Sequence, residues 1–351
     1  MNSLARNDGA WMRRALGLAR RGWGRTSPNP MVGAVVVRDG REVGRGWHHQ
    51  AGTPHAEVHA LNAAGGQARG ATLYVTLEPC CTQGRTPPCT EAILRAGIAR
   101  VVAGGTDPNP KHAGRGFTQL RAAGVEVVEG VEEARCRRLN AAFFKWITTG
   151  RPYVLLKLAM TLDGKIATAG GESRWVTGPV ARARVQRLRR WADGILVGGE
   201  TVRQDDPELT VRTPADWPRP PRKLVWTRRG PGAFPRTLRI WADPLRPPAF
   251  VAAQTSGDWE RWLDQMGGQG ITALLVEGGG ELAAACLRAG VVDRVAFFVA
   301  PKILGGRDSR AAVGGVAPAS LASALGVQDW QCRAVGGDLL ITGDLSKMRN
   351  S

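Results

Sequence analysis

The chain has 351 residues, of which 43% are hydrophobic and 22% are charged. This length exceeds one ordinary domain and fits two domains of roughly 150–200 residues, each able to bury a core. No apolar run approaches the ~20 residues that a membrane helix needs, and the N-terminal segment lacks the uninterrupted apolar stretch of a secretory signal. We therefore expect a cytoplasmic protein with no membrane partner.

The charge of the chain is strongly positive, because 48 Lys and Arg outnumber 30 Asp and Glu and give a formal net charge of +18. Such an excess is also found in nucleic-acid-binding proteins. Here, however, the basic residues are isolated or in short pairs, with no Lys/Arg block of five or more and few aromatic residues beside them. This pattern favours a solvated surface, predicts no nucleic-acid partner, and is compatible with small phosphorylated substrates and NADP.

The first half of the chain alternates predicted helices and strands, as an α/β domain does. A helical face over 10–19 precedes two strands that a tight turn at 38–41 joins. Three prolines and a glycine force the segment 78–89 into a loop. The remaining elements are a helix at 55–64, a strand at 71–77, a helix at 90–97, a strand at 100–105, a short helix closed by Gly124, a strand at 125–130 and one long helix from about 131 to 147.

The second half is also predicted to be α/β, and it restarts with a strand at 153–160 followed by the segment 161–168. Pro-rich, charged stretches at 214–222 and 230–248 indicate surface connections with short strands between them. The remaining elements are a helix at 179–191, a strand at 194–199, a strand, glycine turn and helix over 271–290, a strand at 294–301 and two strands around Gly336–Gly337. The junction near 148–152 gives two domains, at 1–148 and 149–351.

A histidine and two cysteines form the strongest chemical pattern in the chain. His55 lies two residues before Glu57, and Cys80 and Cys89 follow on a Pro-Cys loop. One imidazole and two thiolates make a three-ligand zinc site with a fourth position open for water, whose pKa zinc lowers to about 7. Glu57 can then lie beside the metal without binding it and move the proton from water to a departing amine. His-x-Glu with a later Pro-Cys is the signature of zinc deaminases.

Taken singly, each of these residues is an ordinary core or surface residue, and only the ordered set favours a metal. Cys81 is not expected to bind the same ion as Cys80, because adjacent side chains of an extended segment point to opposite sides. His59 lies one helical turn beyond His55 and, without a His-Glu-x-x-His pattern, is interpreted as a helix-surface or core residue. The six cysteines of a chain without an export signal do not indicate a disulfide framework.

The spacing of the cysteines distinguishes this chain from nucleic-acid base deaminases, which usually carry Pro-Cys-x-x-Cys. Here eight residues separate Cys80 from Cys89. The segments SPNPMVGAVVV, GWHHQAGTPHAEVHAL, TLEPCCTQGRTPPC and DPNPKHAGRG occur in this order and, together, resemble the deaminase half of the bifunctional riboflavin deaminase–reductase family. The resemblance covers nearly all of residues 10–150 and implies a cytidine-deaminase-like αβα domain.

The resemblance also implies roles for single residues of the first domain. It makes Glu57 the proton shuttle, and it gives one zinc per chain with the ligands His55, Cys80 and Cys89. The resemblance also implies that the ring or ribose phosphate of the substrate is faced by Asn29, His48, Arg85 and the loop 107–116. The family commonly has Ser-His after its Pro-Cys, where this chain has Cys81-Thr82. If that histidine contacts substrate, Thr82 weakens or replaces the contact.

The second domain contains a glycine turn between a predicted strand and helix, at which backbone N–H groups can approach a phosphate. Gly278, Gly280 and Ala283 formally fit the dinucleotide fingerprint, although a plain tight turn fits equally well. A Rossmann domain places this pattern at its first strand, whereas here it comes about 125 residues into the domain. The sequence therefore argues against a Rossmann fold but keeps dinucleotide phosphate binding.

The segments RPYVLLKLAMTLDGKIAT, GESRWVTG, GGETVRQDDPELTVR, LLVEGGGEL and VAPKILGG resemble the reductase half of the same family, whose fold resembles dihydrofolate reductase. The resemblance implies an α/β reductase domain with a catalytic polar cluster of Lys157, Asp205 and Glu277. It implies that NADPH is held by Ala159, Trp175, Thr201, Asp205, Gly279, Gly280, Glu281 and Leu282. Around the substrate it places Lys157, Ser173, Arg189, Leu209, Arg212 and Glu277.

The sequence thus predicts a bifunctional enzyme of riboflavin biosynthesis. The first domain would deaminate 2,5-diamino-6-ribosylamino-4(3H)-pyrimidinone 5′-phosphate with zinc. The second would reduce the ribosyl group of 5-amino-6-(5-phosphoribosylamino)uracil to ribityl with NADPH. The family resemblance further implies a homo-oligomer, either a dimer or a tetramer. Two alternatives are a nucleic-acid base editor, which the cysteine spacing disfavours, and a binding protein with degenerate sites, which the complete zinc and Glu57 set disfavours.

Overall fold

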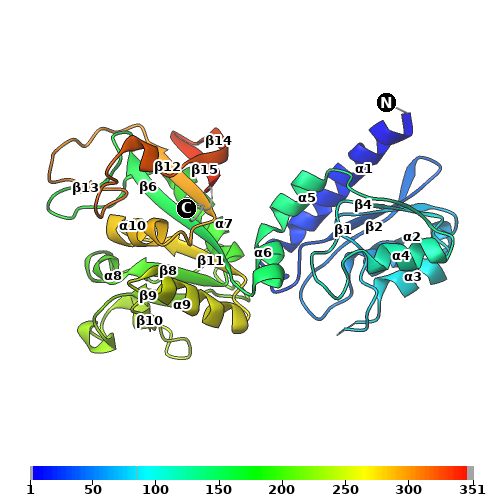
Figure 1. Cartoon of the computed structure of the whole chain (residues 1–351), viewed down its shortest axis with the longest axis horizontal. Coiled ribbons are helices and arrows are strands. Elements are labelled where there is room, and N and C mark those ends of the chain that lie inside the picture. Colours follow the sequence, from blue (N-terminus) through cyan, green and yellow to red (C-terminus); the bar gives the residue numbers. More distant parts are fainter. Residues whose placement is uncertain (1–2, 85, 346–351) are drawn as a thin grey trace. The chain divides into compact units, whose positions relative to one another are not determined.

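The computed structural model describes residues 3–84 and 86–345, and its contacts divide the chain into two compact units, residues 1–150 and 151–351. The division falls two residues after the boundary expected from the sequence, between the last helix of unit 1 and the first strand of unit 2 (Figure 1). Each unit combines one large β-sheet with helices, so both are α/β. Within the described residues, no helix combines the length and the apolar character that crossing a membrane requires.

Unit 1 is built on a five-stranded sheet with the order β2-β1-β3-β4-β5. Strand β1 pairs antiparallel with both β2 and β3, while β3, β4 and β5 are parallel. The strands are β1 (Gly33–Arg38), β2 (Arg41–Trp47), β3 (Thr72–Val75), β4 (Arg100–Ala103) and β5 (Glu126–Val128). The helices are α1 (Ser3–Ala19), α2 (Ala56–Ala64), α3 (Cys89–Arg95), α4 (Arg115–Ala122), α5 (Glu133–Leu139) and α6 (Ala141–Thr149).

The alternation of side chains along β1 creates two cores, one on each face of the sheet. Val35 and Val37 join a buried cluster with Met12 and Leu16 of α1. Ala34 and Val36 face a second cluster that contains residues of α2, α3 and α4. Helices therefore cover both faces of the sheet, which gives the three-layer arrangement seen on the α1 to α4 side of Figure 1.

The long helix expected from about 131 to 147 is wrong, because the chain breaks it into α5 and α6 at Asn140. Asn140 is buried, and its side chain binds the backbone of Met31 twice: Oδ1 accepts from the Met31 N–H at 2.8 Å and Nδ2 donates to the Met31 carbonyl at 2.9 Å. These two hydrogen bonds satisfy the backbone N–H and carbonyl of Met31, which lies in a loop and pairs with no strand among the described residues. Local helical periodicity does not reveal a contact between residues so far apart in the sequence.

Unit 2 is built on an eight-stranded sheet with the order β10-β9-β8-β11-β6-β12-β15-β14. The strands from β10 to β12 are parallel, and β15 and β14 add antiparallel at one edge. The strands are β6 (Tyr153–Thr161), β8 (Gly194–Gly198), β9 (Arg222–Trp226), β10 (Ala249–Val251), β11 (Ala273–Glu277), β12 (Arg294–Ala300), β14 (Val327–Val335) and β15 (Asp338–Leu345). A separate pair joins β7 (Lys165–Ala167) to β13 (Arg310–Ala311).

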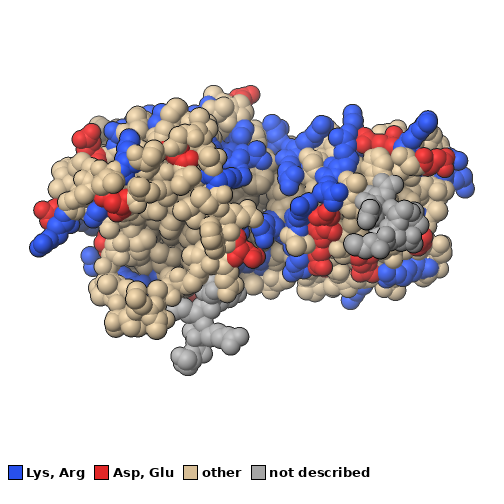
Figure 2. Space-filling model, turned by 90° about the horizontal axis from the view of Figure 1, so that it is seen from above, with Lys and Arg blue, Asp and Glu red and all other residues tan. Residues whose placement is uncertain are grey.

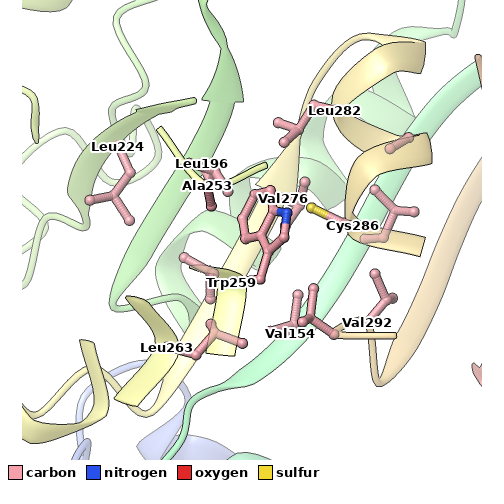
Figure 3. Close-up of a cluster of buried hydrophobic side chains, with 14 of the residues drawn as sticks. Val154, Leu196, Leu224, Ala253, Trp259, Leu263, Val276, Leu282, Cys286 and Val292 are labelled. Carbon is pink, nitrogen blue, oxygen red and sulfur yellow. The ribbon is translucent and has the colours of Figure 1, made fainter. Parts of the chain in front are cut away.

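Helices also cover both faces of this larger sheet. Helix α7 (Pro179–Trp191) contributes Ala181 and Val185 to the core on one face. On the other face, Trp259 of α9 (Ser256–Gly268) and Leu282 of α10 (Gly280–Arg288) pack against Val276 of β11 (Figure 3). Trp259 is only 1% exposed. The strands of this sheet read as continuous apolar runs because both of their faces are buried.

Two helices of unit 2 were not anticipated from the sequence, α8 (Gly199–Asp205) and α9. Helix α9 begins with a capping box in which Thr255 accepts from the Asp258 N–H and Asp258 accepts from the Thr255 N–H. The pattern Thr-x-x-Asp is a start signal that the sequence does contain. Glycines at both ends of the segment weaken its helical pattern and account for the omission.

The basic residues lie at many separate places on the face of the molecule shown in Figure 2, alternating with acidic and uncharged residues. Many arginines of the chain are paired with carboxylates, among them Arg14 with Glu42 and Arg121 with Glu129. This dispersal agrees with the expectation of a solvated charged surface on the face that is seen.

Candidate functional site

Three metal-binding side chains from separate segments meet in unit 1. His55 immediately precedes α2, Cys80 lies in the loop after β3, and Cys89 is the first residue of α3. His55 Nδ1 lies 3.5 Å from Cys80 Sγ and 3.3 Å from Cys89 Sγ, and the three ligand atoms all lie within 4.8 Å of one another. Across residues 3–84 and 86–345, no other such group of His, Cys, Asp and Glu is found. The donor set matches the preference of zinc for nitrogen and sulfur.

Two glycines of β2 fix the position of the helix that carries this histidine. A Cβ atom on Gly44 would lie 2.3 Å from the Ala60 carbonyl oxygen, and one on Gly46 would lie 2.4 Å from that of Ala56. Both distances are far below van der Waals contact, so only glycine allows α2 to pack this closely on β2. The close packing brings the N-terminus of α2, and His55 with it, to the cysteine loop.

The cysteine loop is held together around Cys80. The Cys89 N–H donates to Cys80 Sγ at 3.3 Å, and the Thr90 N–H donates to the Cys80 carbonyl at 3.2 Å. A hydrogen bond from the Cys89 thiol, together with nearby His55, lowers the pKa of Cys80 to about 4 against the opposing effect of burial. One sulfur of the pair is therefore ready to act as a thiolate ligand. Cys81 Sγ lies outside the cluster, 3.8 Å from His112 Nδ1.

Glu57 is buried beside the cluster and one of its carboxylate oxygens is unsatisfied. Its side chain belongs to the first turn of α2 and only 3% of the residue is exposed. Oε2 is buried and has no hydrogen-bond partner among residues 3–84 and 86–345, and burial raises the pKa of Glu57 to about 7. An unpartnered buried carboxylate oxygen is costly, so its presence here indicates a ligand or a reacting group at this position.

Two of the expected substrate residues lie together next to the metal ligands. Asn29 Nδ2 lies 3.1 Å from His48 Nε2, and the ring centroids of His48 and His55 are 5.1 Å apart. His48 Nδ1 lies 3.2 Å from the Pro54 carbonyl, and burial lowers the pKa of His48 to about 4. Neutral His48 therefore donates from Nδ1 and accepts from Asn29 at Nε2. Arg85 lies outside the described residues.

His59 lies on the outer side of the same region and stacks against His49. Their ring centroids are 4.4 Å apart with an interplanar angle of 9°, and Trp47 stacks on His49 in turn. His59 is not part of the metal cluster.

In unit 2, every residue expected to act in the reductase half lines one cleft of about 1550 Å³. The cleft lies where strands β6, β8, β9 and β11 end, because parallel strands bring their carboxyl ends to the same edge of the sheet. The expected residues in the lining are Lys157, Ala159, Ser173, Trp175, Arg189, Thr201, Asp205, Leu209, Arg212, Glu277, Gly279, Gly280, Glu281 and Leu282.

A buried ion pair organises the floor of this cleft. Glu277 accepts two hydrogen bonds of 2.8 Å from Arg189, one on each carboxylate oxygen, and lies directly opposite Lys157 in the pairing of β11 with β6. Burial alone would raise the pKa of Glu277, but the charges of Arg189 and Lys157 and the hydrogen bonds from Arg189 outweigh it and lower this pKa. Burial lowers the pKa of Lys157. Glu277 is thus a fixed carboxylate, and Lys157 is the more readily deprotonated of the two cations.

Asp205 also lines the cleft, but its hydrogen-bond partner lies outside the Arg189–Glu277 pair. Its Oδ1 accepts a hydrogen bond of 2.6 Å from the Ser173 hydroxyl. In the part of the chain that the structure describes, no hydrogen bond or ion pair joins Asp205 to Lys157 or Glu277. The expected cluster therefore consists of one buried pair and a separate Ser173–Asp205 contact. Leu209, which follows Asp205 closely, is buried at a φ of 54°, a strained conformation for a branched side chain.

The glycines after β11 differ in how much room they leave for a side chain. A Cβ atom on Gly280 would lie 2.5 Å from the Ala311 carbonyl oxygen, so the fold itself requires glycine there. A Cβ atom on Gly279 would approach only Thr201 Oγ1, at 3.4 Å, and this residue has an ordinary φ of −69°. Gly279 is therefore dispensable for packing, and its bare backbone faces the cleft at the N-terminus of α10. The carboxylate of Glu281 accepts from the Gly315 N–H at 3.1 Å and holds a neighbouring loop.

Comparison with known proteins assigns both units. Residues 5–105 match the family model of the cytidine and deoxycytidylate deaminase zinc-binding region, and residues 152–341 match that of the RibD C-terminal domain. The chain is 42% identical to the riboflavin biosynthesis protein RibD of Synechocystis sp., over 97% of this chain and 96% of that protein. It is 45% identical to RibD of Escherichia coli, over 85% of this chain and 89% of that protein. This chain belongs to the RibD family.

Solved RibD structures share the fold of the whole chain. RibD of Acinetobacter baumannii is 37% identical with a TM-score of 0.87, over 97% of this chain and 99% of that one. A diaminohydroxyphosphoribosylaminopyrimidine deaminase/5-amino-6-(5-phosphoribosylamino)uracil reductase of Thermotoga maritima is 34% identical with a TM-score of 0.87, over 98% of this chain and 100% of that one. The expected fold class is confirmed: a cytidine-deaminase-like unit precedes a RibD-type reductase unit. The chain is a bifunctional deaminase–reductase of riboflavin biosynthesis.

One residue of the RibD deaminase unit that the sequence did not single out is Glu78. It is 3% exposed and directly precedes Pro79-Cys80. Its Oε2 accepts from the N–H groups of Asp107 at 3.0 Å and Gly114 at 2.9 Å, and its Oε1 accepts from that of Gly116 at 2.9 Å. One carboxylate therefore ties the loop 107–116 to the metal-binding loop. Its position beside the Pro-Cys motif was the only available signal.

Replacing Glu78 by Gln should loosen the loop 107–116. The amide offers a single acceptor oxygen and sets an N–H₂ group against backbone donors, which costs about 1–3 kcal/mol of stability. We expect slower ammonia release, unchanged NADPH-dependent reduction, and faster hydrogen exchange at Asp107, Gly114 and Gly116. Glu91→Gln, on the exposed side of α3, is the matched control. Unaltered exchange at these amides would contradict the role given to Glu78.

Proposed function

We propose that unit 1 replaces the exocyclic amine of 2,5-diamino-6-ribosylamino-4(3H)-pyrimidinone 5′-phosphate with oxygen, using one zinc ion held by His55, Cys80 and Cys89. The observation that carries the proposal is the meeting of these ligands with the unpartnered buried oxygen of Glu57. When bound, zinc activates a water molecule for attack on carbon. The ring and ribose phosphate would lie against Asn29, His48, Arg85 and the loop 107–116.

Glu57 serves in this proposal as the proton carrier. The reaction adds water across the carbon that bears the amine and releases ammonia, so one proton must leave the water and reach the departing nitrogen. Glu57 is not a ligand, and its Oε2 has no other partner to compete for that proton. Its burial keeps bulk water from exchanging the proton during transfer. His48, neutral and fixed by Pro54 and Asn29, would orient the substrate rather than transfer protons.

We propose that unit 2 reduces the ribosyl group of 5-amino-6-(5-phosphoribosylamino)uracil to ribityl with NADPH. When bound, NADPH supplies the hydride. Cofactor contacts would come from Ala159, Trp175, Thr201, Asp205 and the turn Gly279–Leu282, and substrate contacts from Ser173, Arg189, Leu209, Arg212 and Glu277. Hydride reaches the anomeric carbon as its bond to the ring oxygen breaks, and that oxygen takes a proton. Half-buried Lys157 suits the delivery of this proton, because Glu277 is held as a carboxylate by Arg189.

We further propose that the chain works in the cytoplasm as a homo-oligomer, a dimer or a tetramer. Support comes from the edge strand β14, which is exposed along most of its length and presents Trp330 at 65% exposure. An unpaired sheet edge with a large apolar side chain is a typical surface for pairing with another chain.

The zinc assignment predicts about one zinc ion per chain in the purified protein. Cys80→Ser and Cys89→Ser should each lose the metal because a ligand sulfur is removed, whereas Cys81→Ser should keep it. Metal content per chain, measured by plasma mass spectrometry, distinguishes these variants. Equal loss of zinc from Cys81→Ser would overturn the ligand assignment.

Glu57→Gln should separate the two activities. The amide cannot carry a proton, so ammonia release should fall by about 10²–10⁴ while zinc content and the reduction of pre-deaminated substrate stay unchanged. Ammonia assays and NADPH absorbance measure the two reactions independently. A variant that fails at both reactions would show that the two sites are not independent.

Asp205→Asn and Gly279→Val should affect opposite parameters of the reductase. Asp205→Asn keeps the shape but cannot exchange a proton, so it should lower the rate of hydride transfer more than NADPH affinity. Gly279→Val places a side chain where backbone approaches the cofactor, so it should weaken NADPH binding more than the rate. Steady-state NADPH oxidation with pre-deaminated substrate and cofactor titration give both parameters.

Both variants should deaminate normally, because the substitutions lie in unit 2 and the deaminase site lies in unit 1. The packing around Gly279 tolerates a side chain, whereas Gly280→Val would clash with Ala311 and is unsuitable. An Asp205→Asn enzyme with unaltered turnover would exclude Asp205 from the catalytic role.

A further inference from the structure

Two arginines in the lining of the unit 2 cleft have no role in the proposed chemistry. Arg228 and Arg229 lie two and three residues after the end of β9, line the cleft and are exposed. Within the described residues, neither guanidinium has an ion-pair partner. Some arginines of the same lining are paired with carboxylates, such as Arg203 with Glu200 at 2.7 Å and Arg239 with Glu208. Four others form no ion pair among the described residues: Arg174, Arg182, Arg288 and Arg310. Arg228 and Arg229 therefore present uncompensated positive charge to the cleft.

The sheet topology sets the distance between these arginines and the glycine turn. Strand β11, which ends at the turn Gly278–Gly280, is followed across the sheet by β8 and then by β9. All three strands are parallel, so their carboxyl ends lie along one edge. Two strand spacings separate the glycine turn from the end of β9, roughly 10 Å. This is the scale of one adenosine group, so a dinucleotide whose pyrophosphate lies at the glycine turn can extend its adenosine ribose toward Arg228 and Arg229.

The backbone after β9 is fixed in place. The Thr227 N–H donates to the Val251 carbonyl at 2.8 Å, and the Arg229 N–H donates to Thr227 Oγ1 at 3.0 Å. A Cβ atom on Gly199 would lie 3.1 Å from Thr227 Cβ, so this turn packs directly on the start of α8. The two arginines thus extend from an anchored turn, which reduces the entropy lost when they bind an anion.

The sequence of this turn also distinguishes between the two nicotinamide cofactors. Residues 226–230 read WTRRG and include no acidic residue. In Rossmann folds, an Asp or Glu accepts from the ribose 2′-hydroxyl of NAD, whereas an arginine accommodates the 2′-phosphate of NADP. The fold of unit 2 is different, but the same side-chain chemistry distinguishes the two cofactors. Guanidinium groups bind phosphate oxygens through charge-assisted, bidentate hydrogen bonds.

We propose that Arg228 and Arg229 bind the 2′-phosphate of NADPH and give the reductase its preference for NADPH over NADH. This inference rests on the proposed function of unit 2. The substrate also carries a phosphate, which the proposed function places at a different cationic group. Arg189 and Arg212, the expected substrate residues, are close enough that their like charges contribute to lowering the pKa of Arg212, after burial.

The first test compares two ligands that differ only in the 2′-phosphate, 2′,5′-ADP and 5′-AMP, by isothermal titration calorimetry on the full chain. The unaltered chain should bind 2′,5′-ADP more tightly. The double variant Arg228→Gln/Arg229→Gln should lose about ten- to hundredfold in affinity for 2′,5′-ADP and none for 5′-AMP. Arg246→Gln, an exposed arginine outside the cleft, is the control and should change neither.

The second test is kinetic and uses pre-deaminated substrate. In the double variant the KM for NADPH should rise about as much as the affinity for 2′,5′-ADP falls, while kcat and the KM for NADH stay unchanged. Equal losses for NADPH and NADH, or no loss for either, would overturn the proposal. Weaker competition by ribose 5-phosphate in the double variant would also overturn it, by assigning the arginines to the substrate phosphate. If the unaltered chain bound neither dinucleotide, the proposed function itself would fail, a result distinguishable from any effect of the variants.

Discussion

The cost of burying a carboxylate governs both sites, and the chain meets this cost in three different ways. Glu277 is compensated by a bidentate ion pair with Arg189 and by the charge of Lys157. Glu78 is compensated by three backbone N–H groups. Glu57 retains one oxygen that has no hydrogen-bond partner in the described part of the chain. Because an uncompensated buried carboxylate destabilises the fold, its retention indicates function, whereas the two compensated carboxylates hold other groups in position.

The meeting of His55, Cys80 and Cys89 was predictable from sequence because these residues lie in short, ordered motifs. His55, Cys80 and Cys89 fall within 35 residues, and the loop and helix that carry them are marked by proline and by helical spacing. Glu78 was not predictable, because its partners are backbone donors of a loop about 30 residues away and leave no side-chain pattern. The helix break at Asn140 was not predicted for the same reason, because the Asn140 side chain forms its hydrogen bonds with the backbone of Met31.

The reductase site depends on topology rather than on local motifs. Lys157 and Glu277 are 120 positions apart and become direct neighbours only because β6 pairs with β11. No periodicity in the sequence specifies that pairing, so these residues could be named only from the resemblance to a family. Even then, the resemblance indicated which residues line the cleft but not which of them are hydrogen-bonded to one another. Asp205 was expected beside Lys157 and Glu277, but it accepts a hydrogen bond from Ser173.

The high positive charge of the chain is explained only in part by its ligands. Both proposed reactions act on phosphorylated substrates, and NADPH adds further phosphates, so a cationic cleft in unit 2 is expected electrostatically. The cations that line this cleft differ in how freely they can meet an anion. Arg189 is held by Glu277, and Arg203 and Arg239 are held by surface acids, whereas within the described residues no ion pair joins Arg228 or Arg229 to a carboxylate. The carboxylate partner of a paired arginine cancels part of the electric field of that arginine. Anions within the cleft are therefore directed by which arginines are paired, and not by the net charge of +18.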